Sequence, residues 1–323
     1  MLKFVKGREN LSVTVFVPFD CDNGCKFCSS KQEYKKGTNF ESVLEQLKEF
    51  RYSDIEEIVF TGGEPMADLE KLKVLVKAVN NKKVFINTYL INKNVVEFID
   101  FINQTDCIKG VNISRHHVNY DQDCKFLKNI APDVLIKFIK KPVKINVVKT
   151  EEIIDEKESK AIIERWSNLG CNNLTVCFRT DYRKRKNIHD LSDPNIAMLS
   201  NFCNYSGRSF CDVCDTTYFK YNNICVSYHR GTMIVTVKFG DTLEINDIII
   251  DQLGNLYYDW DHKKENLEEF KEAFNISSDN STISGNIMKA YKESRRPTIS
   301  CGGPSLVGSS SIRFGTCYGG GRC

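Results

Sequence analysis

Short apolar segments alternate with amphipathic segments through the first 180 residues of the chain. The apolar segments are rich in β-branched residues, which is typical of buried strands, and they occupy residues 11–17, 58–60, 84–86, 111–113, 143–148 and 174–178. The segments between them carry apolar residues at helical spacing, as at Leu72, Leu75, Val76 and Val79. This alternation requires crossover connections, so it predicts a parallel sheet, either an open doubly wound sheet or a barrel-like curve. In both architectures a functional site lies at the carboxyl ends of the strands.

The pattern changes in the last third of the chain. Segments with strand character, joined by Gly-Asp and Gly-Asn turns, follow one another at residues 225–228, 233–239, 243–250 and 256–260. They predict a small antiparallel unit, and Leu267, Phe270 and Phe274 predict a helix after it. We therefore predict two parts, a first domain over residues 1–180 and a C-terminal appendix over residues 181–323, whose tail is rich in glycine.

Charge and hydropathy exclude several classes of protein. The chain has 323 residues, with 45 basic and 42 acidic side chains, so bulk charge gives no reason to expect nucleic acid or an anionic membrane as partner. No apolar run is long enough for a spanning helix, and residues 1–10 lack the apolar core of a signal peptide. We therefore expect a cytoplasmic protein without a membrane partner. In that reducing compartment, 14 cysteines favour metal ligands over disulfides.

Three cysteines follow the first predicted strand directly. Cys21, Cys25 and Cys28 lie within eight residues, so their thiolates can wrap one compact metal centre. A ferredoxin-type cubane takes four cysteines, one for each iron. With three, one iron stays open to another ligand, and an open position is typical of catalytic metals. A zinc-binding loop and three unrelated cysteines are the alternatives.

The spacing of these cysteines, with Phe27 between the last two, resembles the Cys-x3-Cys-x-aromatic-Cys signature of the radical S-adenosylmethionine (SAM) superfamily. Residues 61–65, Thr-Gly-Gly-Glu-Pro, follow the second strand and resemble the family's Gly-Gly-Glu-Pro motif. The resemblance implies that Phe27 lies by the adenine of SAM. It also implies that Gly62, Gly63 and Glu64 hold the SAM amino group.

Later strand ends agree with this resemblance, which covers about residues 11–180. Ser114 ends the fourth strand, where the family often places a polar group on the SAM ribose. Asn146 and Arg179 match positions that the cyclase-like subgroup places near the SAM ribose or carboxylate. The implied fold is α/β, a partial (β/α)6 radical SAM barrel with a smaller α+β, cysteine-containing C-terminal region. The implied cofactors are a [4Fe–4S] cluster and SAM, and the implied electron donor is a flavodoxin or ferredoxin.

The resemblance also implies a reaction. SAM chelates the open iron, one electron cleaves it to methionine and a 5′-deoxyadenosyl radical, and that radical takes a hydrogen atom from substrate. Because the pattern is closest to the cyclase-like and peptide-modifying subgroup, we expect a peptide or protein side chain as substrate. A nucleotide or RNA substrate is a less favoured alternative, supported only by the basic run at residues 183–186. A non-enzymatic zinc- or Fe–S-binding module is the third alternative.

Two histidines are the candidate catalytic residues. His116 and His117 follow Ser114 at the expected rim of the substrate cavity. A histidine there can transfer protons near neutral pH, bind substrate or help to hold a metal. A hydrogen-bonded structural pair is the alternative.

A second group of cysteines, Cys203, Cys211, Cys214 and Cys225, offers four thiols in 23 residues, with His229 nearby. Cys-x2-Cys is a common half of a metal site. We predict a second metal centre here, either an auxiliary Fe–S cluster or zinc, with no metal as the alternative. Cys301, Cys317 and Cys323 are candidates to complete it, to bind another metal or to act as redox thiols.

Overall fold

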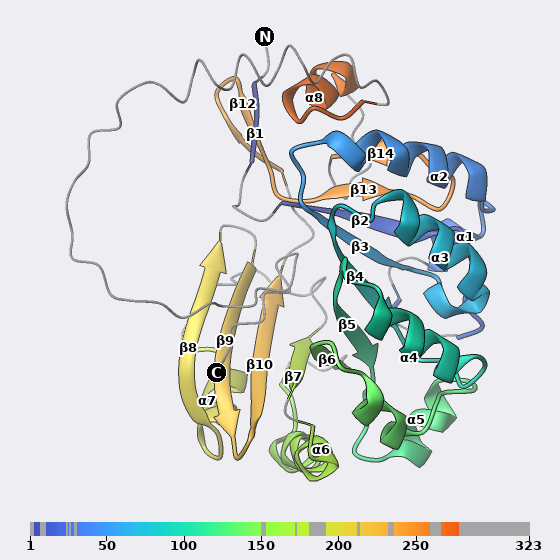
Figure 1. Ribbon diagram of the computed structural model, residues 1–323. Helices are drawn as coiled ribbons and strands as arrows, with labels where there is room; N and C mark the ends of the chain where they lie inside the picture. The colour runs from blue at the N-terminus through green and yellow to red at the C-terminus, as the bar shows by residue number, and fades with distance from the viewer. Residues whose placement is uncertain are drawn as a thin grey trace.

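The computed structural model describes most of the chain up to residue 277, in the ranges 3–6, 11–23, 25, 27–28, 31–149, 153–171, 173–180, 192–211, 214–231, 236–258 and 266–277. A curved 11-stranded sheet forms its centre, in the order β14-β13-β2-β3-β4-β5-β6-β7-β10-β9-β8 (Figure 1). A separate three-stranded sheet has the order β1-β12-β11.

Six parallel strands form the middle of the large sheet and pair in the order of the sequence. They are β2 (Ser12–Val17), β3 (Glu57–Gly62), β4 (Lys83–Thr88), β5 (Ile108–Ser114), β6 (Val143–Lys149) and β7 (Leu174–Thr180). Four helices cover the convex face of the sheet: α2 (Phe40–Glu49), α3 (Leu69–Ala78), α4 (Val95–Gln104) and α6 (Glu156–Leu169) (Figure 1). The short helices α1 (Lys31–Tyr34) and α5 (Tyr120–Phe126) lie at the carboxyl ends of the strands, where Tyr34 bonds Val17 and Phe126 stacks on Phe27. The predicted α/β fold, a partial barrel of parallel strands, is confirmed.

Local sequence explains where the long helices begin and end. The side chains of Asn39, Asp68 and Asp155 accept hydrogen bonds from backbone amides in the first turns of α2, α3 and α6. Gly170 ends α6 with φ of 75°, a left-handed conformation that glycine adopts without strain. The fully buried Trp166 shows how the apolar stripe of α6 packs against the sheet.

The short helix α5 has an equally local start and end. It covers Tyr120–Phe126, and Leu127 follows it in extended conformation. Asn119 starts this helix, because its side chain accepts a hydrogen bond of 2.9 Å from the backbone N–H of Gln122.

The C-terminal strands extend the large sheet at both edges. An antiparallel meander of β8 (Asn204–Cys211), β9 (Cys214–Tyr221) and β10 (Ile224–Gly231) joins β7 through parallel pairing of β10. At the other edge β13 (Ile248–Ile250) pairs in parallel with β2 and antiparallel with β14 (Leu256–Tyr257). A C-terminal antiparallel region is therefore present, as predicted, but its β10 and β13 continue the first sheet. The division at residue 180 stays a prediction.

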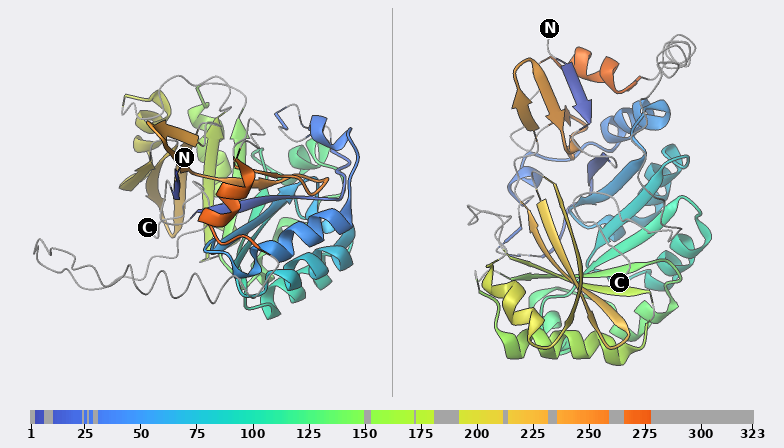
Figure 2. Two further views of the ribbon diagram at one scale, coloured as in Figure 1. Left: turned by 90° about the horizontal axis from the view of Figure 1, so that it is seen from above. Right: turned by 90° about the vertical axis from the view of Figure 1, so that its left-hand side faces the viewer.

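The remaining elements lie beside the main sheet. Helix α7 (Pro194–Ser200) packs on the meander, where the Asn195 amide donates to the Tyr228 hydroxyl at 2.8 Å. The small sheet is formed by β1 (Lys3–Lys6), β11 (Thr236–Phe239) and β12 (Thr242–Ile245). It lies next to the predicted last helix, α8 (Leu267–Ala273), where the rings of Phe4 and Phe270 meet edge to face at 5.6 Å (Figure 2).

The two faces of the main sheet differ in chemistry. Val13, Val15 and Val17 of β2 belong to the apolar core beneath the helices. The opposite, concave face carries buried polar residues, including Asn112, Lys144, Ser227 and His229. Burial lowers the pKa of Lys144 to about 8. Because buried polar groups are costly without partners, this face is suited to polar ligands rather than to packing.

Candidate functional site

The three cysteines after β2 lie together in a half-buried loop. Cys21, Cys25 and Cys28 are free thiols, and the Cys28 amide donates to the Cys25 carbonyl at 3.2 Å, which closes a tight turn. Burial raises the pKa of Cys21 to about 12 and that of Cys25 to about 11, and the neighbouring thiols and Glu64 disfavour the Cys21 thiolate further. A cationic metal centre reverses this effect because it stabilises thiolates directly.

The described residues include no group of three His, Cys, Asp or Glu side chains placed to hold a single metal ion. A cubane does not require such a group, because each of its irons takes its own thiolate. The donor set of three half-exposed thiols in one loop therefore fits a cluster better than a zinc ion.

The glycine loop after β3 lies in backbone contact with the cysteine-bearing loop. A Cβ atom on Gly63 would overlap the carbonyl oxygen of Phe19, and Gly62 has φ of 98°. The hydroxyl of Tyr34 bridges the loops, since it donates to the Val17 carbonyl at 2.6 Å and accepts from the Gly63 amide at 2.5 Å. The two predicted motifs therefore meet at the carboxyl edge of β2 and β3.

Glu64 is buried beneath these loops. Its carboxylate accepts hydrogen bonds from the backbone amides of Met66 at 3.0 Å and Tyr89 at 2.9 Å, and from the hydroxyl of Thr88. Burial raises the pKa of Glu64 to about 7, against the effect of these donors. Glu64 thus joins the end of β3 to the end of β4, in addition to any bond with a ligand.

The other predicted SAM contacts lie on the concave face. Ser114 pairs in register with Asn146, which pairs with Cys177 of β7. Arg179 lies two residues beyond Cys177 on β7, opposite Val148. The side-chain oxygens of Asn112 and Asn146 are buried and have no hydrogen-bond partner among the residues that the structure describes. Since buried acceptors are nearly always satisfied, these two oxygens fit a site that receives donors from a bound molecule.

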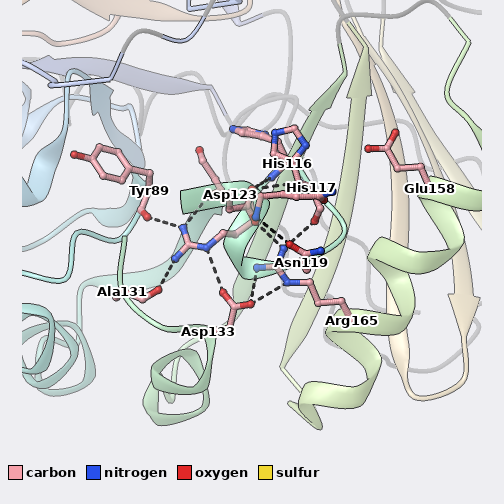
Figure 3. A network of polar contacts seen from close by, with 12 residues as sticks. Tyr89, His116, His117, Asn119, Asp123, Ala131, Asp133, Glu158 and Arg165 are labelled. Carbon is pink, nitrogen blue, oxygen red and sulfur yellow. Dashed lines mark hydrogen bonds and ion pairs between the residues drawn. The ribbon is translucent and has the colours of Figure 1, made fainter. Parts of the chain in front are cut away.

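The segment after Ser114 is held by a buried ionic network (Figure 3). Asp123 is fully buried and accepts from the backbone amides of His116 and His117 at 2.8 and 3.2 Å. Arg165 of α6 binds Asp123 at 2.6 Å and Asp133 at 2.5 Å. This network fixes the backbone of both histidines.

Arg115 adds a second set of contacts to the network. Its guanidinium donates to the carbonyls of Tyr89 at 2.6 Å and Ala131 at 3.0 Å, and it pairs with Asp133 at 3.3 Å (Figure 3). Arg115 therefore connects the end of β4 to the end of β5, and its role is structural. Tyr34, Asp123 and Arg165 carried no motif, so the sequence offered no signal for them.

The environment of His116 does not favour the predicted proton transfer. Its ring contacts Phe27 edge to face at 5.0 Å, and its Nδ1 accepts from the Val148 amide at 3.2 Å. Burial lowers its pKa to about 3, so the ring is neutral near neutral pH. The ring of His117 lies against Phe126 at 5.5 Å.

This burial predicts a pH-dependent stability. The pKa of His116 is about 3 in the folded protein, against 6.5 for an ordinary histidine. The neutral, buried ring therefore contributes fully to the unfolding free energy above pH 6.5, and this contribution is lost as the pH falls toward 3. In cluster-free protein, we expect the wild type to lose about 2 kcal/mol more unfolding free energy than His116→Gln between roughly pH 7.5 and pH 5. Denaturant unfolding at both pH values measures this difference, and parallel losses in the two proteins would contradict it.

The second group of cysteines does not converge. Cys211 and Cys214 pair at the turn between β8 and β9, whereas Cys203 precedes β8 and Cys225 is the second residue of β10, at the opposite end of the meander. An eight-residue strand separates the two ends by roughly 20 Å, too far for one metal centre with all four ligands. Cys225 is moreover disulfide-bonded. In this arrangement the four cysteines are divided between the two ends of the meander, and a second metal centre stays a prediction.

His229 lies on β10, two residues before Gly231, which pairs with Cys214. Its Nδ1 hydrogen-bonds the Thr216 hydroxyl at 2.8 Å on the concave face. The basic run at residues 183–186, and Cys301, Cys317 and Cys323, lie outside the described residues. None of the helices in the described part of the chain has the length and apolar character needed to cross a membrane.

Two solved structures are reported as similar, and the match to SuiB supports the fold. SuiB of Streptococcus suis, in its complex with the precursor peptide SuiA, matches with a TM-score of 0.51 and 15% identity over 77% of this chain and 59% of SuiB. Coproporphyrinogen III oxidase (HemN) of Escherichia coli matches with a TM-score of 0.41 and 12% identity, over 84% of this chain and 71% of HemN. The chain thus spans about three fifths of the length of SuiB.

Comparison with curated protein sequences found no match. The family model of the radical SAM superfamily, in contrast, matches residues 15–191, which is more than half of the chain and includes both predicted motifs. The family's cofactors are a [4Fe–4S] cluster and SAM, in agreement with the loops that meet beyond β2 and β3. The chain belongs to the radical SAM superfamily.

Proposed function

We propose that this radical SAM enzyme abstracts a hydrogen atom from a peptide or protein side chain. The observation that carries the proposal is the contact between two loops at one sheet edge. Three half-buried thiols lie on one loop, and the other reaches it so closely that Gly63 has no room for a Cβ atom. The concave face beside them is polar and contains the oxygens of Asn112 and Asn146, for which the described part of the chain offers no donor.

Each residue group has a distinct task in this proposal. Cys21, Cys25 and Cys28 would hold the cluster and leave one iron for SAM. When bound, the reduced cluster supplies the electron that cleaves SAM to methionine and a carbon radical able to take hydrogen from substrate. The glycine loop and Glu64 orient the amino acid half of SAM, and Phe27 covers its nucleoside half. Ser114, Asn146 and Arg179 supply polar contacts from the concave face.

The peptide substrate is supported by two considerations. SuiB, which shares the fold at low identity, is described in complex with a precursor peptide. The concave face offers side chains that both donate and accept hydrogen bonds, such as Asn87, Asn112 and Ser227. Such side chains suit the N–H and C=O groups of a peptide. No described residue provides comparable support for RNA.

A turnover assay tests the proposal. Anaerobically reconstituted protein should release 5′-deoxyadenosine from SAM, and low-molecular-mass cell fractions that contain the substrate should increase the rate. Protease treatment of the active fraction should remove the increase, whereas nuclease treatment should not. The reverse pattern would identify a nucleic acid substrate, and absence of SAM cleavage in iron-loaded protein would overturn the proposed activity.

Two variants at Glu64 separate the effect of its charge on SAM binding from its effect on the stability of the fold. We expect Glu64→Gln to be destabilised less than the alanine variant, because its oxygen still accepts from the Met66 amide and the Thr88 hydroxyl while its NH2 group faces the Tyr89 amide. We expect it to bind SAM about 2–5 kcal/mol more weakly than the wild type. The reason is that the glutamine lacks the charge that faces the SAM ammonium. Calorimetric titration of the reconstituted protein with SAM measures this loss.

Glu64→Ala is the companion variant. It should weaken SAM binding similarly and should also destabilise the fold, because buried amides of Met66 and Tyr89 lose their acceptor. Wild-type SAM affinity in Glu64→Gln would exclude the charge recognition that we propose.

A further inference from the structure

Nearly every polar atom of His116 has a hydrogen-bond partner within the protein. Its backbone amide donates to Asp123 at 2.8 Å, and its carbonyl accepts from the Lys149 ammonium at 3.0 Å. Its ring Nδ1 accepts from the Val148 amide at 3.2 Å. The remaining polar atom, Nε2, has no hydrogen-bond partner among the described residues.

The contact at Nδ1 fixes the tautomer of this histidine. An imidazole nitrogen that accepts a hydrogen bond from a backbone N–H cannot itself carry a proton. The neutral ring must then carry its proton on Nε2, which makes Nε2–H a donor that cannot accept. This conclusion follows from the backbone partner alone, because Val148 N–H can only donate.

The ring is also held rigidly in place. Phe27 and Phe126 contact it edge to face at 5.0 and 5.5 Å, and its exposed fraction is 3%. Asp123, which holds the backbone of His116, is itself bound by Arg165 (Figure 3). Lys149 is paired with Glu158 at 2.6 Å. A donor held by so many contacts loses little entropy when it meets an acceptor.

We propose that His116 donates a hydrogen bond from Nε2 to the nucleoside half of SAM. The inference rests on the proposed use of SAM at this site. The ring lies against Phe27, in the same loop as Cys25 and Cys28, so the donor is at the cluster end of the barrel. The amino group of SAM offers only donors, and its carboxylate belongs to the half that we assign to the open iron, whereas its adenine and ribose offer neutral acceptors beside which aromatic side chains pack well. His116 is therefore a binding residue and takes no part in proton transfer.

Two substitutions at this position separate the donor from the shape of the ring. His116→Phe keeps a flat ring against Phe27 and Phe126 but has no N–H. His116→Gln can place an amide N–H near the position of Nε2. We expect His116→Phe to bind S-adenosylhomocysteine and 5′-deoxyadenosine about tenfold more weakly than the wild type, which is typical of one lost hydrogen bond. His116→Gln should recover most of that affinity.

The measurement is calorimetric titration of the cluster-loaded enzyme with these two compounds and with methionine. Methionine affinity should be equal in all three proteins, because methionine lacks the nucleoside. Equal affinity of wild type and His116→Phe for 5′-deoxyadenosine would overturn the inference, as would an equal loss in His116→Phe and His116→Gln. In either case SAM cleavage by the wild type would leave the proposed function intact, whereas loss of cleavage in the wild type would refute both.

Discussion

Replacing Cys21, Cys25 and Cys28 together by alanine is expected to remove about four irons from each reconstituted protein chain and to abolish SAM cleavage. The three thiols are free and half-buried, and Cys25 and Cys28 are close enough to raise the pKa of Cys21. They lie where the loops after β2 and β3 meet, and none of the other free thiols in the described part of the chain belongs to either loop. Iron and sulfide analysis after anaerobic reconstitution measures the first effect, and 5′-deoxyadenosine release measures the second.

A matched triple variant controls for the loss of thiols in general. Cys107, Cys124 and Cys171 are also free, and none lies in the cysteine-bearing loop. Their replacement by alanine should leave the iron content and the rate of SAM cleavage unchanged. If the first variant retained the wild-type iron content, the assignment of the cluster to this loop would be wrong. Iron that remained in part would indicate a second centre with other ligands.

The six parallel strands could be predicted because their signal is local. Each strand and each amphipathic helix carries its own apolar periodicity, and short crossovers leave few ways to connect them. The pairing of β13 with β2 joins residues such as Ile249 and Thr14, which lie more than 200 positions apart. No local pattern encodes such a pairing. The sequence therefore predicted a separate antiparallel unit, where the structure has an extension of the main sheet.

The same distinction applies to the site. Cysteine spacing and the glycine motif are local, and both loops lie where the strand pattern predicted them. The clamp of Asp123 by Arg165 depends on the packing of α6 beside α5, and it cannot be read from either helix alone. Four cysteines that were close in sequence are separated because two of them lie at each end of the β8–β10 meander. Proximity in sequence predicts a metal site only when the chain between the ligands turns back rather than extends.

Gly63→Ala is expected to disable the enzyme even though it adds one methyl group. The added carbon would overlap the carbonyl oxygen of Phe19, which belongs to the backbone and cannot rotate away. The hydroxyl of Tyr34, bound to Val17 and Gly63, prevents the loops from separating easily. Relief of the overlap must therefore move the glycine loop relative to the cysteine-bearing loop.

Such a displacement of about 1 Å between two binding loops can reduce a rate roughly 100-fold, and the overpacking should destabilise the fold by about 1–3 kcal/mol. Gly37→Ala is the control, because Gly37 has φ of 94° and nothing within 4 Å of its Cβ position. That variant should lose about 1 kcal/mol of stability from backbone strain and keep its rate of SAM cleavage. The rate of 5′-deoxyadenosine release and the denaturant midpoint of both variants measure the two effects. A rate for Gly63→Ala within a few-fold of that for Gly37→Ala would show that contact between the loops does not control SAM cleavage.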